Sequence, residues 1–369
     1  MNSTQRVEIL QRWRVVQHEL IPELKQEIGP LTPRLEKLIH TLEWVRIEEF
    51  VASTWNGRGR PPHDRGALAN AFVAKALLGL GTTAALIERL QMDRALKRIC
   101  GFPIWKRLPD ESSFSRAFAE FARAKLAERV HEALVKAHLG AELIGHISRD
   151  GTAIEAREKP LKKVPAAAEP KPGKAKRGRP EKGERREAKP TRIGQQLRQP
   201  LAQILADLPK RCDRGTKCNA HGYKNSWNGY KLHTDTADCG VPISALLTSA
   251  SVHDSQTAVP LALMTQGRVT HCYDLMDAAY CSEEIRSHSR SLGHVPLIDH
   301  NPRKGEKIEF APHEAQRYKE RSQAERTNAR LKDEFGGKQV GVRGHAKVMS
   351  HLMFGLLVLT ADQLMRLLT

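Results

Sequence analysis

The residues best suited to chemistry lie on one stretch near the C-terminus. Residues 318–332 contain no Pro or Gly and many helix formers, so the stretch is predicted to be helical. Each helical residue advances by about 100°, which places four polar side chains within about 60° on one face: Tyr318, Arg321, Glu325 and Lys332. A carboxylate beside a phenol, a guanidinium and an ammonium suits a metal ion next to a phosphate. The alternative is an exposed helix stabilised by surface ion pairs.

Two further carboxylates occupy predicted strand positions. Asp150 lies in the alternating segment Leu143–Ile154, and Asp277 directly follows the segment Arg268–Met276. A mixed sheet with helices packed on it brings strand ends together, so Asp150, Asp277 and Glu325 are predicted to converge. Three carboxylates bind hard cations such as Mg²⁺. Two such ions, about 4 Å apart, hold the attacking and leaving oxygens of a phosphoryl transfer.

Several neighbouring acids compete for these roles. Asp274 lies three residues before Asp277 and points to the opposite face of the strand, so Asp277, at the strand end, is the preferred ligand. Asp235 and Asp238 flank a hairpin and are predicted to be turn residues. Asp254 follows a strand, where it either reaches the site as a supporting group or caps a loop.

The charge of the chain predicts a polyanionic partner. The sequence holds 60 Lys and Arg against 42 Asp and Glu, a formal net charge of +18, which favours nucleic acid over a membrane surface. Between Arg157 and Lys189 there are 13 basic and 5 acidic residues and few large apolar ones, a composition typical of disorder. Arg177 and Arg179 form an Arg-Gly-Arg-Pro pattern that resembles a minor-groove-binding AT-hook. The alternative is general attraction to phosphates.

The chain changes character at about residue 141. Residues 1–140 read as helices, and the pair 65–80 and 84–90, joined by a glycine turn, has the outline of a helix-turn-helix, which any helical bundle also offers. Five strands are predicted after it: Leu143–Ile154, Trp227–Asp235, Val241–Ser249, Arg268–Met276 and His294–Ile298. The apolar run Val348–Thr360 is too short to span a bilayer and is predicted to be a buried helix. The absence of a signal-like N-terminus and the scattered cysteines predict a cytoplasmic protein without membrane contact.

The helix resembles a signature of known enzymes. The spacing Tyr-(2)-Arg-(3)-Glu-(6)-Lys is similar to that of one group of DDE transposases from bacterial insertion sequences. Asp150 in Ser-Arg-Asp-Gly-Thr and Asp277 in Asp-Ala-Ala-Tyr resemble the first and second aspartates of this family. The resemblance implies an α/β fold with an RNase H-like mixed sheet flanked by helices, preceded by an all-helical N-terminal domain. The implied domains are a DNA-binding domain at 1–140 and a catalytic domain at 141–369 with a basic, disordered insertion at about 157–200.

The resemblance also implies roles for the candidate residues. Asp150, Asp277 and Glu325 would be catalytic and hold two Mg²⁺ (or Mn²⁺) ions, while Tyr318, Arg321 and Lys332 would bind DNA. The expected activity is cleavage at the inverted-repeat ends of an insertion sequence and joining of the 3′-OH to target DNA. The expected partners are double-stranded DNA and a second copy of the chain, in the bacterial cytoplasm at the nucleoid.

Two alternative functions fit the same residues, and the sequence differs from some members of the family in one respect. A catalytically inactive or co-opted DNA-binding protein, or a cellular nuclease of the same fold, would share most of these features. Only 47 residues separate Asp277 from Glu325, which leaves no room for the large β insertion with which some relatives handle DNA hairpins.

Overall fold

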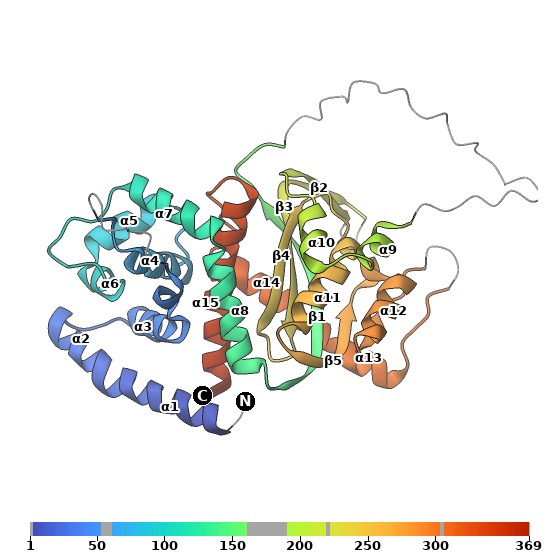
Figure 1. Ribbon diagram of the computed structural model, residues 1–369, viewed down its shortest axis with the longest axis horizontal. Helices are drawn as coiled ribbons and strands as arrows, with labels where there is room; N and C mark the ends of the chain where they lie inside the picture. Colours follow the sequence, from blue (N-terminus) through green and yellow to red (C-terminus); the bar gives the residue numbers. More distant parts are fainter. Residues whose placement is uncertain (1–2, 53–60, 161–189, 219–221, 303–305, 369) are drawn as a thin grey trace, which may run out of the picture.

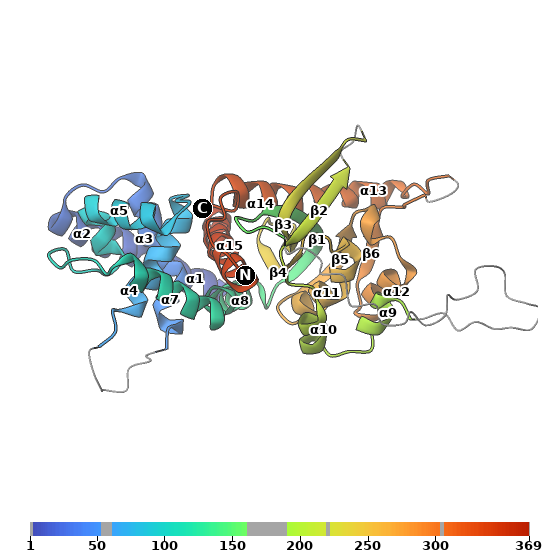
Figure 2. The ribbon, with the colours of Figure 1, turned by 90° about the horizontal axis from the view of Figure 1, so that it is seen from above.

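One long helix separates a helical region from a mixed sheet. The computed structural model describes residues 3–52, 61–160, 190–218, 222–302 and 306–368. Helix α15 (His345–Leu368) lies between the N-terminal helices and the sheet (Figures 1 and 2). It is apolar and long enough to cross a membrane, but 94% of its most apolar window is buried inside the protein. The prediction of a buried helix is therefore confirmed.

The N-terminal region is helical, as predicted. Its elements are α1 (Ser3–Val15), the π-turn η1 (Val16–Leu20), α2 (Ile21–Ile28), α3 (Pro33–Val45), η2 (Ile47–Phe50), α4 (Arg65–Leu77), α5 (Thr83–Met92), α6 (Arg94–Ile99), α7 (Glu111–Arg123) and α8 (Leu126–Leu139). Side-chain caps start several helices: Asp64 accepts from the N–H of Gly66, and Thr82 accepts from that of Ala85. Helix α4 is buried along nearly its whole length, so it forms core rather than a DNA-facing surface.

An aromatic cluster joins these helices to α15. Phe72 of α4 contacts the rings of Phe114, Phe118 and Phe121 on α7, so this face of α7 is part of the core. Phe354 of α15 contacts Phe72 and Phe118. The same hydrophobic core continues through α8 and α15 to the inner strands of the sheet. The helical region and the sheet therefore share one core.

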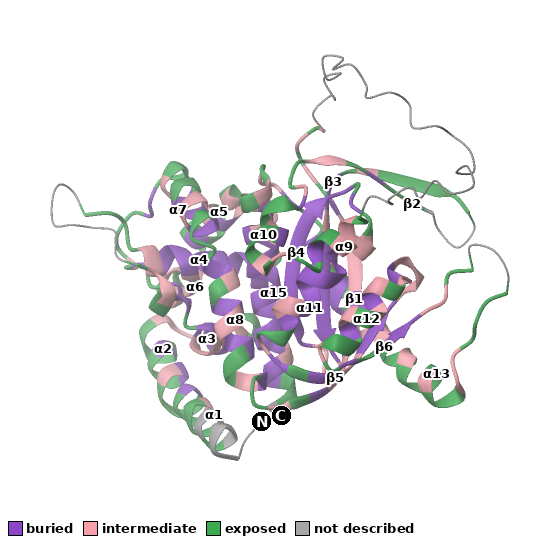
Figure 3. Cartoon of the chain, turned by 45° about the vertical axis from the view of Figure 1, so that its right-hand side comes forward, coloured by how far each residue is buried: buried purple, intermediate pink, exposed green. Residues whose placement is uncertain are grey.

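The described residues form a six-stranded mixed sheet. Its strands are β1 (Leu143–Glu155), β2 (Asp213–Cys218), β3 (Lys224–Ala237), β4 (Pro242–Ser249), β5 (Thr270–Met276) and β6 (Val295–Ile298). Strand β3 pairs antiparallel with β1 on one side and with β2 and β4 on the other. On its far side β1 pairs parallel with β5, which pairs parallel with β6. The five predicted strands are confirmed, and the central ones are buried (Figure 3).

Strand β2 and two helices, α9 (Arg192–Gln196) and α10 (Leu201–Asp207), were among the elements not predicted from the sequence. Strand β2 was missed because its sequence, Asp-Arg-Gly-Thr-Lys-Cys, lacks the alternation of apolar residues that marks a half-buried strand. Helix α9 lies within the insertion expected to be disordered at about 157–200, and helix α10 follows it in a stretch for which no element was predicted. The predicted insertion therefore includes folded residues at its C-terminal side. Arg177 and Arg179 lie outside the described residues.

Helices cover both faces of the sheet. Helix α11 (Ala258–Gln266) packs on one face, where Thr265 donates to Asp235 of β3. Helix α14 (Ser322–Asp333) packs on the opposite face, where Asn328 donates to Asp150 of β1. The remaining elements are η3 (Asp254–Thr257), η4 (Ala278–Tyr280), α12 (Glu283–Ser291), α13 (Pro312–Tyr318) and η5 (Lys319–Arg321).

A buried ion network links the three central strands. The guanidinium of Arg149 on β1 donates two hydrogen bonds of 2.7 Å to the carboxylate of Asp235 on β3. It also lies 3.9 Å from the carboxylate of Asp274 on β5. The prediction that Asp235 is a turn residue is wrong, because strand β3 continues to Ala237 and Asp235 is fully buried. The strand extends there because Asp235 has a buried cation as its partner.

Replacing Arg149 with Met should destabilise the protein strongly. The change keeps a side chain of similar length but leaves Asp235 and Asp274 as buried carboxylates without their cation. The free energy of unfolding, measured by urea denaturation, should fall by about 3–5 kcal/mol. The control Arg290→Met, which removes an exposed ion pair with Glu283, should lower it far less. Similar losses in both variants would contradict the role of the network.

Candidate active site

The helix that carries the polar stripe is interrupted by one turn. The sequence predicted a single helix, but the structure shows α13, a 3₁₀ turn at Lys319–Arg321 and then α14. The turn keeps Tyr318, at the end of α13, close to the sheet, where its hydroxyl donates to the backbone carbonyl of Met276 at 3.1 Å. The helical segment is thereby fixed to the end of β5.

Asp150 lies within β1, on the face covered by α14. Its Oδ2 accepts a hydrogen bond of 3.0 Å from the Asn328 amide, and its Oδ1 lies 3.9 Å from the Arg321 guanidinium. Burial raises the pKa of the Asp150 carboxyl; Arg321 lowers this pKa, and the negative charge of Asp277 raises it. The net pKa is raised, so the positive charge of Arg321 does not fully offset burial and repulsion.

Asp277 stands where the parallel pairing of β1 and β5 ends. The last such pair is Arg149 with Met276, so Asp150 and Asp277 each follow one partner of this pair. Asp277 caps the 3₁₀ turn η4, accepting from the Ala279 N–H at 3.0 Å. Its pKa is raised, first by burial and next among the charged groups by Asp254. Asp150 and Asp277 thus lie at the same end of two adjacent strands, where the charge of Asp277 raises the pKa of Asp150.

Asp274 has a structural environment instead. It accepts hydrogen bonds from His271 at 3.1 Å and Ser289 at 2.5 Å, and it is fully buried near Arg149. Burial raises its pKa, but these hydrogen bonds and the Arg149 charge lower it further, to a value well below the ordinary one. Asp274 is thus saturated with partners, which supports the preference for Asp277.

Glu325 points to Arg321, its neighbour one turn earlier on the stripe. The Arg321 guanidinium donates to the Glu325 carboxylate and lies 3.9 Å from Asp150, so one cation joins these two candidate residues. The Glu325 side chain is 57% exposed. The structure brings Asp150, Asp277, Arg321 and Tyr318 together and places Glu325 at the open side of the group.

The carboxylates fit a hard cation in chemistry. Asp150, Asp277 and Glu325 offer oxygen donors, and the raised pKa of both aspartates shows a shortage of positive charge. Across the described ranges there is no group of three or more His, Cys, Asp or Glu side chains close enough to hold one metal ion. The third carboxylate is engaged by Arg321 rather than by a shared site with the two aspartates.

Lys332 is the last residue of the stripe. Burial lowers its pKa, as does the nearby charge of Lys217, while Asp150 raises it. Lys332 therefore lies within electrostatic range of the first aspartate, as the helical spacing predicted. Tyr318, Arg321 and Lys332 thus each act on residues of β1 or β5, whereas Glu325 lies at the open side.

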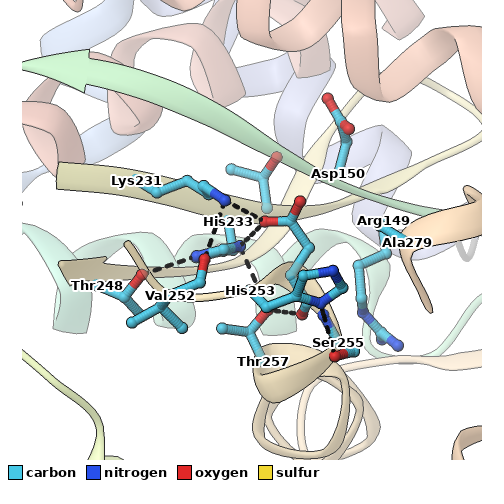
Figure 4. A network of polar contacts seen from close by, with 12 residues as sticks. Arg149, Asp150, Lys231, His233, Thr248, Val252, His253, Ser255, Thr257 and Ala279 are labelled. Atoms are coloured by element: carbon cyan, nitrogen blue, oxygen red, sulfur yellow. Dashed lines mark hydrogen bonds and ion pairs between the residues drawn. The ribbon is translucent and has the colours of Figure 1, made fainter. Parts of the chain in front are cut away.

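Asp254 is the neighbouring residue whose position the sequence left open. It lies at the start of η3, and its Oδ1 is 3.0 Å from the Lys231 ammonium and 3.5 Å from His233 Nδ1. Figure 4 shows Lys231 and His233 in this network, beside Asp150. A Cβ atom at Gly151 would stand 2.8 Å from the Asp254 carboxylate, so only glycine permits this approach to β1. The sequence analysis did not identify Lys231 and His233. Their spacing of two residues, which places both on one face of a predicted strand, was the signal that could have shown them to be neighbours.

His233 keeps this network compact because it is neutral. It is fully buried, contacts the hydroxyls of Thr248 at 2.9 Å and Thr257 at 3.3 Å, and has a pKa lowered to about 4, chiefly by burial. Lys231 is thus the one cation paired with Asp254 near neutral pH among the described residues. At the same end of η3, His253 is the N-cap, and its Nδ1 accepts from the Ser255 N–H.

Comparison with known families agrees with this arrangement. A family model described as "Transposase DDE domain" matches residues 150–361, more than half of the chain. The chain belongs to this transposase family. A second model, described as "Transposase domain (DUF772)", matches residues 20–120 of the transposase. No curated protein and no solved structure matches the chain.

The matched regions relate directly to the structure. The first begins at Asp150 and includes Asp277 and Glu325, so all three carboxylates of the transposase lie inside it. The second spans the helices from α2 to α7. The residues between the two matches, 121–149, include α8, which joins the helical region to the first strand.

Replacing Asp254 with Asn should lower the pKa of Asp277. The negative charge of Asp254 raises that pKa, so its removal lets Asp277 ionise at lower pH. Carbon-detected NMR titration of the Asp277 carboxyl measures the change. Asp238→Asn, in the turn after β3, is the matched control and should leave the Asp277 pKa unchanged. An unchanged or higher Asp277 pKa in the Asp254 variant would show that the two carboxylates are not coupled.

Proposed function

We propose that this transposase binds the terminal inverted repeats of an insertion sequence, cleaves the DNA at the ends and joins the 3′-OH to target DNA. The observation that carries the proposal is the meeting of Asp150 and Asp277 at the end of the β1–β5 pairing, with Arg321 beside them. The family match and the net charge of +18 support it. Double-stranded DNA would be the substrate, and two copies of the chain would pair two ends in the bacterial cytoplasm.

The sheet supports an RNase H-like assignment. Three parallel strands, β1, β5 and β6, stand beside an antiparallel hairpin of β3 and β4, and helices cover both faces. In open α/β sheets, ligands bind beyond the strand ends, at the crevice between adjacent strands. The two aspartates lie at such a position. We therefore assign residues 141–369 as the catalytic domain and residues 1–140 as a helical DNA-binding domain.

Each polar residue of the site would have its own task. Asp150, Asp277 and Glu325 would hold two Mg²⁺ or Mn²⁺ ions, which when bound activate the attacking hydroxyl and neutralise charge on the leaving oxygen. The Asn328 amide holds Asp150 Oδ2 by a hydrogen bond, while Oδ1 points toward Arg321. Tyr318 anchors the helical segment to the end of β5 through the Met276 carbonyl. Arg321 and Lys332 place positive charge where a DNA phosphate would lie.

The lysine partner of Asp254 suggests a supporting task for that pair. Asp254 approaches β1 over Gly151, directly after Asp150, and its charge acts on Asp277. Lys231 binds both Asp254 and the backbone carbonyl of Val252, which fixes the loop before η3. We assign Asp254 as a positioning residue that holds the two strand ends at their present separation.

Neutral substitution of each candidate carboxylate should abolish most of the cleavage. Asp150→Asn, Asp277→Asn and Glu325→Gln should each slow metal-dependent cleavage of labelled transposon ends by on the order of 100-fold or more, because charge in the transition state loses its support. Glu320→Gln is the matched control, since Glu320 is exposed on the same helical segment but lies off the stripe.

The cleavage assay also separates the alternative functions. Wild-type rates in all three variants would overturn the assignment of the carboxylates. Binding without any cleavage by the wild type, in Mg²⁺ or Mn²⁺, would indicate a DNA-binding protein that has lost catalysis. Equal cleavage of DNA with and without the inverted repeats would indicate a nuclease. Circular dichroism of each variant checks that the fold is retained.

Replacing Arg321 with Ala should weaken binding of a transposon-end duplex. If Arg321 contacts a phosphate, the slope of log K against log salt should fall by about 0.9. Arg326→Ala is the control, since Arg326 is exposed about one turn further along the helix and donates a hydrogen bond to the Ser322 hydroxyl rather than to a candidate carboxylate. Unchanged binding with slower cleavage would show instead that Arg321 holds the Glu325 carboxylate in place.

A further inference from the structure

A two-stranded ribbon extends from the sheet beside the candidate active site. Strand β3 pairs with β1 only from Gly229 onward, while its first residues, from Lys224, pair with β2 alone. Figures 2 and 3 show β2 and the start of β3 projecting beyond the body of the sheet. Most side chains of this ribbon (residues 213–218 and 224–229) are exposed. The ribbon therefore contributes little to the hydrophobic core.

The ribbon nevertheless has a defined shape. The ring of Trp227 packs on Gly215 of the opposite strand so closely that any Cβ atom at Gly215 would collide with it. The Trp227 indole N–H donates to the Tyr230 carbonyl at 3.0 Å, and the hydroxyls of Thr216 and Ser226 are 3.1 Å apart across the strands. An isolated hairpin is marginally stable in water, so these contacts brace the extension.

The ribbon carries positive charges without counter-charges. Arg214, Lys217 and Lys224 are exposed, and none of them forms an ion pair with another described residue. The one acid of the ribbon segments, Asp213, accepts hydrogen bonds from the Ser251 hydroxyl at 2.6 Å and from the Arg214 backbone N–H at 2.8 Å. By contrast Lys231, further along β3, has Asp254 as its partner. On the described residues of β2 and β3, the cations without an ion pair therefore all lie in the ribbon.

The cations occupy both faces of a ribbon that joins the sheet near the candidate active site. The pairing register places Arg214 and Lys224 on one face and Lys217 on the other. Gly229, the last residue of the ribbon, pairs with Asp213 of β2 on one side and with Glu155 of β1 on the other. Glu155 lies five residues after Asp150 on β1, so the ribbon leaves the sheet on the strand next to the one that carries the first candidate carboxylate. Lys217 also lowers the pKa of both Asp150 and Asp277, which agrees with this position.

We propose that the ribbon formed by residues 213–218 and 224–229 is a DNA-binding arm that holds the phosphates of the duplex next to the candidate catalytic carboxylates. A two-stranded β-ribbon has the width of the DNA major groove, and unpaired Lys and Arg side chains are the usual partners of phosphate oxygens. The inference rests on the proposed action on DNA, and it adds a contact surface outside the helical stripe. Arg214, Lys217 and Lys224 are its phosphate ligands.

The test compares a neutral and a charge-preserving variant of the full chain. The neutral variant is Arg214→Gln, Lys217→Gln and Lys224→Gln; the matched control is Arg214→Lys, Lys217→Arg and Lys224→Arg. Binding of a fluorescent DNA duplex is measured without divalent metal at several salt concentrations. Each lost phosphate contact should lower the slope of log K against log salt by about 0.9, so the neutral variant should lose up to about 2.7. The control should keep the wild-type slope.

The outcomes distinguish this inference from the proposed function. If the wild type binds DNA and the neutral variant binds with the same affinity and slope, the ribbon is not a DNA contact. If both triple variants weaken equally, the shape of the ribbon rather than its charge matters, which also overturns the assignment. If the wild type itself does not bind DNA, the proposed function fails. Lys217→Gln alone, a single exposed change, provides the same comparison should a triple variant not fold.

Discussion

The ion network around Arg149 is the constraint on which the site depends. A guanidinium and two carboxylates are costly to remove from water, and they are tolerated only because the geometry pairs them closely. The pairing needs β1, β3 and β5 in one register, because each strand supplies one member. Arg149 directly precedes Asp150, and Asp274 lies three residues before Asp277. By fixing the register of these strands, the network sets the relative positions of Asp150 and Asp277. It lies on the face of the sheet covered by α11, opposite the face on which Asp150 meets α14.

The site exists because one strand continues where its neighbour stops. Strand β1 remains paired with β3 up to Glu155, whereas its pairing with β5 ends at Arg149. Beyond that point the edge of β1 is open to groups from other elements. Asp277 enters from the end of β5, Asp254 from the turn before α11, and Arg321 from the 3₁₀ turn before α14. Arg321 lies 3.9 Å from Asp150, yet the pKa of Asp150 and that of Asp277 both stay raised.

Local patterns in the sequence predicted most of the elements but not their long-range partners. The helical stripe, the strands around Asp150 and Asp277 and the buried C-terminal helix followed from spacing and composition. Asp235 was misjudged because hairpin-flanking aspartates are usually turn residues, and nothing near it in the sequence revealed Arg149, 86 residues earlier. Strand β2 was not predicted because it belongs to a ribbon that buries little apolar surface, so its sequence lacks alternating apolar residues. The approach of Asp254 to Gly151 depends on a contact 103 residues apart in the chain, which spacing alone cannot show.

The position of helix α15 has a consequence for how the protein is made. This helix is synthesised after the other described elements, yet it fills the centre of the core shared by the helical region and the sheet. Phe72 and Phe118 meet their partner Phe354 only after residue 354 has left the ribosome. Neither half can complete its packing before then, so apolar surface stays uncovered until α15 emerges. A chain shortened by premature termination before residue 345 would lack this helix and would be a substrate for chaperones and proteases rather than a smaller working protein.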